Sequence, residues 1–168
     1  MTDLHDTQSA TRLAIVQALY QIEISGNSCD LVAEQFLLDH RGAIGVDEKI
    51  KKIDRKNFFH MLTKIHEGTG ILDNTISSVL SDRWSMDRLG ATMRALMRSA
   101  CYELTDRPDV PARVVIKEYV DMARGFHDLE ETGFVNASLD NLARSLRGAE
   151  MKMIIPKQDS EKNGNNSE

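Results

Sequence analysis

The sequence has 168 residues and a formal net charge of −5, with 26 acidic and 21 basic side chains. This length fits one domain that buries its own core, and it leaves no room for a second full domain. The two cysteines, Cys29 and Cys101, form no C-x-x-C pair, and the first ten residues are polar rather than an apolar signal. No apolar run approaches the roughly 20 residues of a membrane helix, so we expect a cytoplasmic, reduced protein that spans no membrane.

Charge is distributed unevenly along the chain. Residues 1–86 carry 9 basic and 12 acidic side chains, and residues 125–168 carry 5 and 8. Residues 87–124 carry 7 basic and 6 acidic side chains, which makes this the one net positive block. Because nucleic-acid binding normally draws on a surplus of Lys and Arg, the total charge argues against such a partner, and the middle block is the exception.

Segments with helical periodicity follow one another, and no segment shows the alternation of a strand. The first, Thr11–Ile24, is apolar on most sides and ends at a Ser-Gly-Asn turn. Asp30 is placed to cap a second helix, Leu31–His40. Apolar stripes over residues 58–65 and 71–80 predict two further helices. We therefore expect an all-α fold.

Three more helices are predicted in the second half, over about Asp87–Leu104, Pro111–Phe126 and Phe134–Arg147. Pro108 favours a turn, and Pro111 suits the first position of a helix. The end of the chain is polar and lacks aromatic residues. We expect a flexible segment over residues 1–10, a single helical domain over residues 11–148 and a disordered polar tail over residues 149–168.

Sequence motifs of catalytic and metal sites are absent. There is no phosphate-binding glycine loop, no G-x-S-x-G and no H-E-x-x-H. The five histidines show no metal-ligand spacing, since His60 and His66 are six residues apart and ligands on one helix face are usually four apart. We expect no enzymatic activity, no metal and no cofactor.

Two of the late helices combine an apolar face with a row of polar side chains. The rows are Arg113, Lys117 and Arg124 on one helix, and Arg94, Arg98 and Tyr102 on the other. Phe134 falls outside the apolar stripe of the last helix, so we expect it to be partly exposed. Unpaired bases stack on aromatic and guanidinium planes while Lys and Arg bind phosphates, so these residue types suit single-stranded RNA. The alternative, that they are solvated faces and packing residues, stays open at this point.

Five short motifs, taken in order and spacing, resemble those of the NusB family over about Thr11–Leu146. They are IVQALY (residues 15–20), MRSACYEL (97–104), DVP (109–111), VVIKEYVDMARGF (114–126) and FVNASLD (134–140). Each motif is short, but their common order and spacing identify the chain as similar to this family over most of its length.

The resemblance implies an all-α fold of two packed three-helix bundles. It also implies a transcription antitermination factor that binds the boxA RNA of ribosomal RNA leaders together with small-subunit ribosomal protein ten, NusE, in the RNA polymerase antitermination complex. The resemblance implies RNA contacts at Arg12, Gln17, Tyr20, Arg98, Arg113, Phe134 and Asn136. The residue types of the two helix rows add Tyr102 and Lys117 to the expected contacts. Contacts to NusE are expected on the helix surface from Asp87 to Arg98, and the oligomeric state, monomer or homodimer, is left open.

The sequence departs from the family pattern at three places. Family members usually enter the first helix with several arginines, and this chain keeps only Arg12 there. Lys117 stands where the family has Asn, and Ala137 stands where it has Gly. Each lost phosphate contact flattens the salt dependence of binding to a single strand by about 0.7 log units. We therefore expect weaker RNA binding than in a typical member and more reliance on NusE.

Two alternatives keep the helical fold and change the function. One is a protein-only adaptor or ribosome-assembly factor with weak or no RNA binding, which the missing arginines favour. The other is suggested by the related helical domain of certain ribosomal RNA cytosine methyltransferases. The chain has no room for their catalytic domain or cofactor motif, so a freestanding enzyme of that kind is not expected.

Overall fold

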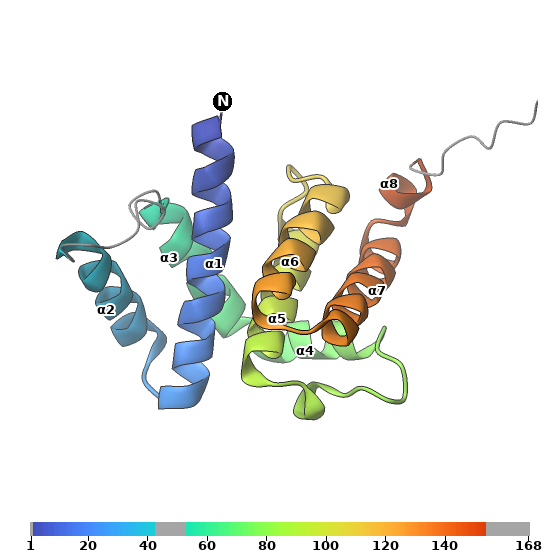
Figure 1. Cartoon of the computed structure of the whole chain (residues 1–168), viewed down its shortest axis with the longest axis horizontal. Coiled ribbons are helices and arrows are strands. Elements are labelled where there is room, and N and C mark those ends of the chain that lie inside the picture. The colour runs from blue at the N-terminus through green and yellow to red at the C-terminus, as the bar shows by residue number, and fades with distance from the viewer. Residues whose placement is uncertain (1, 43–52, 154–168) are drawn as a thin grey trace, which may run out of the picture.

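A computed structural model describes residues 2–42 and 53–153 of the chain, and every regular element in these ranges is helical (Figure 1). The elements in chain order are α1 (Thr2–Ser25), α2 (Cys29–Gly42), α3 (Arg55–Glu67), α4 (Thr69–Ser77), the short 3-10 turn η2 (Met86–Arg88), α5 (Ala91–Asp106), α6 (Ala112–Phe126), α7 (Leu129–Leu146) and α8 (Gly148–Lys152). The all-α prediction is confirmed.

The helices form the two packed three-helix bundles that the family resemblance implied. In the first bundle α1, α2 and α3 pack against one another, and in the second α5, α6 and α7 do so. Figure 1 shows the two groups on opposite sides of the molecule. The contact between α1 and α5 joins them, and α4 packs against α5.

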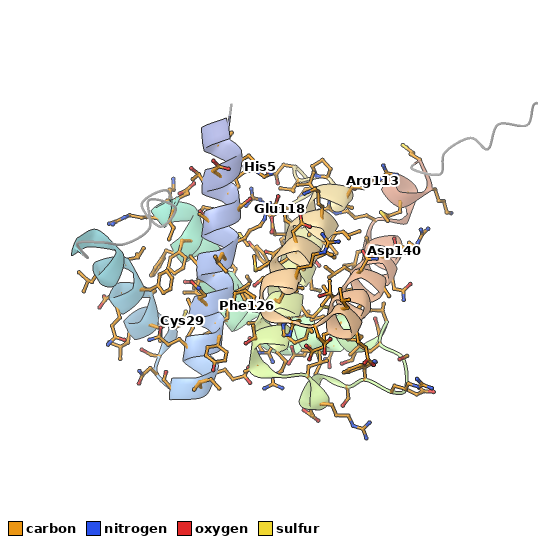
Figure 2. All side chains as sticks on the ribbon, viewed as in Figure 1. His5, Cys29, Arg113, Glu118, Phe126 and Asp140 are labelled. Atoms are coloured by element: carbon orange, nitrogen blue, oxygen red, sulfur yellow. The ribbon has the colours of Figure 1, made fainter. Side chains whose placement is uncertain are left out.

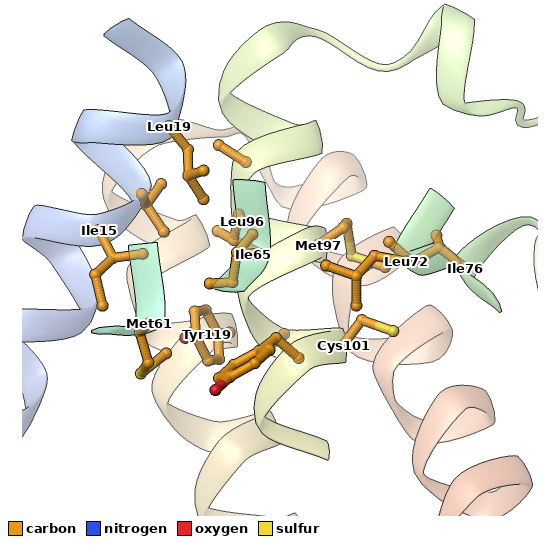
Figure 3. Close-up of a cluster of buried hydrophobic side chains, with 14 of the residues drawn as sticks. Ile15, Leu19, Met61, Ile65, Leu72, Ile76, Leu96, Met97, Cys101 and Tyr119 are labelled. Carbon is orange, nitrogen blue, oxygen red and sulfur yellow. The ribbon is translucent and has the colours of Figure 1, made fainter. Parts of the chain in front are cut away.

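The core runs through both bundles because α5 of the second bundle packs against α1 of the first. Its side chains Leu96, Met97 and Cys101 are fully buried. In Figure 3 Leu96 lies near the centre of the cluster, and Met97 and Cys101 lie on the side of Leu72 and Ile76 of α4. Small residues on α5, such as Ala100, let neighbouring helices approach closely. A helix covered on most sides in this way has little surface left for a ligand.

Helix α6 is covered on one face only. Val115, Tyr119 and Ala123 are fully buried on that face, while Arg113 and Lys117 on the other face are exposed. The prediction of an apolar face backed by basic residues is therefore confirmed for this helix, and the i, i+4 spacing of an amphipathic helix accounts for it.

The first helix begins at Thr2, nine residues before the predicted start at Thr11, so residues 2–10 of the segment predicted to be flexible are helical. Two hydroxyl contacts support these early turns: Ser9 donates to the Glu118 carboxylate of α6 at 2.6 Å, and Thr11 donates to the Thr7 carbonyl at 2.7 Å. The first of these contacts ties the early part of α1 to a residue more than a hundred positions away, which local sequence patterns cannot reveal.

At the other end, α8 lies partly inside the predicted disordered tail, and its Met151 is buried. The rest of the predicted tail, from residue 154, lies outside the described residues. The tail prediction is therefore wrong for residues 149–152, because Met151 supplies an apolar side chain to the core.

Two helix starts differ from prediction because of capping side chains. Helix α2 begins at Cys29, and the Ser28 hydroxyl, rather than the predicted Asp30, accepts the Leu31 N–H at 3.3 Å. Helix α7 begins five residues before the predicted Phe134, since the Asp128 carboxylate accepts the Glu131 N–H at 2.8 Å. The Asp128 N–H in turn donates to the Glu131 carboxylate, and these two reciprocal hydrogen bonds form a capping box.

Candidate nucleic-acid interface

A groove of about 710 Å³ runs between α6 and α7. Its polar lining consists of four cations, two carboxylates and one amide: Arg113, Lys117, Arg124, Arg144, Asp121, Asp140 and Asn136. We call this surface the basic groove. Figure 2 labels Arg113 on α6 and Asp140 on α7, on the two helices that border it.

Helical spacing explains why these side chains meet. On α6 the residues Arg113, Lys117 and Asp121 are four apart, and Arg124 follows three later. On α7 the residues Asn136, Asp140 and Arg144 are also four apart, so each helix turns one polar stripe toward the groove. Both apolar faces remain directed to the core.

Three of the groove's cations form exposed ion pairs. Lys117 Nζ and Arg124 Nη1 lie 2.7 and 2.8 Å from the two carboxylate oxygens of Asp121. Arg144 Nε lies 2.7 Å from the Asp140 carboxylate. The hydrogen bond to Asp121 raises the pKa of Lys117. Exposed pairs of this kind add little to stability and exchange readily with other anions.

The structure brings together three of the nine predicted contact residues in the basic groove: Arg113, Lys117 and Asn136, all exposed. Arg124 was identified as part of the α6 row but was left out of the predicted contacts. Arg144 was missed altogether. The four-residue spacing from Asn136 through Asp140 to Arg144 could have identified it.

Gln17 and Tyr20 lie elsewhere, exposed on α1, and neither lines the basic groove. Tyr20 is 41% exposed and its neighbour one turn later, Ile24, is 62% exposed. Phe126, at the end of α6, is also exposed. Tyr20 thus offers an exposed aromatic ring on α1, whereas the groove offers charge.

Phe134 is partly buried, as predicted, but it does not face the groove. Its ring packs against the partly buried Trp84 with centroids 4.5 Å apart and a tilt of 36°. Residues two apart on a helix point to different sides, so Phe134 and Asn136 face away from each other. The predicted contacts on α7 are therefore divided between two surfaces.

Arg12 is buried, so its prediction as a direct RNA contact is not supported. Its guanidinium donates two hydrogen bonds to the Glu103 carboxylate of α5, at 2.8 and 2.9 Å, and Nη1 lies 3.7 Å from the Glu118 carboxylate of α6. Only 5% of the residue is accessible to solvent. It joins α1 to two helices of the second bundle.

The predicted row Arg94, Arg98 and Tyr102 on α5 is not an open surface. Arg98 donates to both carboxylate oxygens of Asp73 on α4, at 2.7 and 2.8 Å. Tyr102 is 5% exposed. The expectation of an accessible arginine beside an accessible ring is therefore wrong.

The reason is the central position of α5. Helices α4 and α1 cover the side of α5 that carries Arg94 and Arg98, and Glu23 of α1 accepts hydrogen bonds from both arginines. The periodicity of α5 predicted correctly that these residues share a side. Which side a neighbouring helix covers depends on the tertiary packing.

The described residues offer no group of three His, Cys, Asp or Glu side chains that could hold a metal ion. Among the helices in the described ranges, none combines the length and apolar character needed to cross a membrane. The charged and amide side chains of the basic groove are Lys, Arg, Asp and Asn. Lys and Arg can bind phosphates, whereas Asn and Asp can bind base edges.

Comparison with known proteins gives one family. The model of the NusB family matches residues 9–144. The transcription antitermination protein NusB of Maricaulis maris is 39% identical over 138 residues, covering 82% of this chain and 86% of the relative. That of Nitrobacter hamburgensis is 41% identical over 143 residues, covering 85% of this chain and 89% of the relative.

Solved structures show the same fold. NusB of T. maritima superposes with a TM-score of 0.70 and 26% identity, covering 87% of this chain and 96% of that chain. A structure of the antitermination factors NusB and NusE in complex with double-stranded RNA matches with a TM-score of 0.67 and 19% identity. This second match covers 83% of this chain and 97% of that chain, and at this identity it speaks for the fold alone.

Proposed function

Since the chain belongs to the NusB family, we propose that it is a transcription antitermination factor. In this role it binds boxA-type single-stranded RNA of ribosomal RNA leaders together with NusE and joins the RNA polymerase antitermination complex. The proposed role is to assemble this complex rather than to catalyse a reaction, and it is carried out in the cytoplasm, where bacterial transcription occurs. The oligomeric state stays open, and the NusE contact surface from Asp87 to Arg98 stays a prediction.

The basic groove is the observation that carries the RNA part of this proposal. The protein as a whole is acidic, with a net charge of −5, yet four exposed cations lie in one groove beside Asn136. Phosphates supply most of the affinity of nucleic-acid binding, and amides such as that of Asn136 can read base edges. The groove therefore offers both kinds of contact.

We assign the predicted contact residues to two roles. Arg113, Lys117 and Asn136 contact RNA in the basic groove, and the aromatic ring of Tyr20, with Gln17 beside it on α1, offers a stacking surface. Phe134, partly buried against Trp84, is kept as a proposed contact outside the groove. Arg12, Arg98 and Tyr102 support these helices from inside and are not proposed as direct contacts.

A matched pair of double variants tests the groove. Arg113→Ala with Lys117→Ala removes two groove cations, and Arg55→Ala with Lys56→Ala removes two exposed cations at the start of α3. The affinity for a boxA oligonucleotide is measured by fluorescence anisotropy over a range of salt, with and without NusE. We expect the groove variant to lose about 1.4 log units of salt slope, from two contacts of about 0.7 each, and the α3 variant to lose little. Equal losses in the two variants would reject the groove as the RNA site.

A protein-only adaptor is the second candidate, favoured by the pairing of three groove cations with carboxylates. It predicts that NusE binds the chain with unchanged affinity whether or not boxA RNA is present, and that the chain alone binds RNA no better than an acidic control protein. Calorimetric titration with NusE, in the presence and absence of the oligonucleotide, separates the two functions.

A further inference from the structure

Asp121 lies in the basic groove between two cations of its own helix. One carboxylate oxygen is 2.7 Å from Lys117 Nζ, and the other is 2.8 Å from Arg124 Nη1. Residues four and three positions apart share a helix face, so all three side chains line the same groove. A single carboxylate thus neutralises two of the four cations in the groove.

We propose that Asp121 limits the RNA affinity of the basic groove, because RNA phosphates must displace its carboxylate from Lys117 and Arg124. This inference rests on the proposed function and identifies a residue that controls it. A phosphate offers the same kind of anionic oxygen acceptor as a carboxylate, so one can replace the other on each cation. After displacement, Asp121 remains close and repels the phosphates.

The accessibility of the three side chains allows this exchange. Lys117 and Arg124 have side chains that are 72% and 65% exposed, and that of Asp121 is 42% exposed. Exposed pairs are weak and screened by salt, so a phosphate chain with several charges can compete with them. Asp121 therefore moderates binding without preventing it.

Asp140 provides an internal comparison on the facing helix. Its carboxylate lies 2.7 Å from Arg144 Nε and pairs with this one groove cation. Asp140→Asn would free one cation from its carboxylate partner, whereas Asp121→Asn would free two. The number of released cations, and not the loss of one negative charge, should set the size of the effect.

Phosphate contacts are independent of base sequence. The effect of Asp121 should therefore be the same for a boxA oligonucleotide and for a scrambled oligonucleotide of equal length. A gain confined to boxA would mean that Asp121 acts on base recognition, and this outcome would overturn the proposal.

The experiment uses the full chain with Asp121→Asn, Asp140→Asn and, as a control for net charge, Glu34→Gln, an exposed residue of α2. The salt dependence of affinity is measured for both oligonucleotides. We expect Asp121→Asn to bind both oligonucleotides about tenfold more tightly than wild type at low salt, because the phosphates no longer have to displace a carboxylate from two cations. Asp140→Asn should gain about threefold, because one exposed pair is removed instead of two, and Glu34→Gln should resemble wild type.

Binding by Asp121→Asn that equals Glu34→Gln, or is weaker than wild type, would overturn the proposal. Inorganic tripolyphosphate, titrated by calorimetry, separates this failure from failure of the proposed function. If no form of the protein binds RNA but Asp121→Asn binds tripolyphosphate more tightly than Glu34→Gln, Asp121 limits anion binding by the groove, but the RNA function and the RNA part of the inference fail. If wild type binds RNA and Asp121→Asn shows no gain with either probe, only the inference fails. Absence of RNA binding together with absence of a tripolyphosphate gain rejects both.

Discussion

Arg12 of α1 and Glu103 of α5 form a buried ion pair with two hydrogen bonds, 2.8 Å from Nε to Oε2 and 2.9 Å from Nη2 to Oε1. Their side chains are only 6% and 2% exposed. Both charges have left water, so each depends on the other for compensation. Because α1 belongs to one bundle and α5 to the other, this pair helps to fix how the bundles pack.

Arg12→Met should therefore destabilise the fold strongly. Removing one partner leaves Glu103 as an uncompensated buried charge, which costs about 3–5 kcal/mol. Arg144→Met is the matched control, since its pair with Asp140 is exposed and its loss should change stability by less than about 1 kcal/mol. Urea unfolding of both variants measures the difference.

Replacing both partners, Arg12→Met with Glu103→Leu, should recover most of the lost stability because the buried Glu103 carboxylate is removed with its partner. The Glu118 carboxylate keeps its hydrogen bond from Ser9. A cost for Arg12→Met that is no larger than that of Arg144→Met would show that the buried pair is not needed for the packing of the bundles.

The sequence predicted the helices well where a helix has one covered face. On α6 the apolar and basic faces appear in the sequence as they do in the structure, because local periodicity alone determines both. The starts of α1 and α7 were missed. Asp128 and Glu131 formed a recognisable capping box, whereas the contact from Ser9 to Glu118 joins residues that only the fold brings together.

The periodicity predicted which residues share a side on both α5 and α6, but it predicted their exposure correctly only on α6. Periodicity groups residues by side, but it does not tell which sides other helices cover. Arg113 and Lys117 lie on the free side of an outer helix, while Arg98 and Tyr102 lie on a helix that α1 and α4 cover. The acidic partner of Arg12, Glu103, is 91 residues away, and its pairing is set by tertiary packing.

Arg147 should be essential for the end of α5. Its guanidinium donates to the main-chain oxygens of Glu103, Leu104, Arg107 and Val110, and its side chain is 9% exposed. Carbonyls at a helix end lack partners within the helix, so Arg147→Ala should cost about 2–3 kcal/mol. Arg147→Lys should restore only part of this in chemical unfolding, since one ammonium cannot reach four oxygens. Full recovery by Lys would mean that charge alone matters.

Cys101 should make stability depend on pH in the alkaline range. Burial raises the pKa of its thiol from the usual 9.0 to about 11, and Figure 3 shows it within the core. Above about pH 9 the unfolded chain loses this proton while the folded chain retains it. The contribution is therefore complete below pH 9 and is lost as pH rises toward 11, to the extent of about 2 kcal/mol.

The measurement is the free energy of unfolding from pH 8 to 11 for wild type and Cys101→Ala. Other groups titrate in both proteins, so the difference between the two curves isolates Cys101. A difference that stays constant over this range would show that the thiol is not buried in solution as it is in the structure.

Arg98→Ala should weaken the fold and leave RNA binding unchanged. Its two hydrogen bonds to Asp73 and one to Glu23, at 3.2 Å, connect α5 with α4 and α1. Hydrogen bonds to charged groups contribute about 1.5–3 kcal/mol, so the melting temperature should fall clearly. Asp73→Asn should have a similar effect, and the double variant should cost less than the sum of the two, since both remove the same interaction. Affinity for boxA RNA and its salt slope, measured well below the melting temperature, should match wild type. An unchanged melting curve with a tenfold loss of RNA affinity would instead mean that Arg98 leaves Asp73 to bind a phosphate.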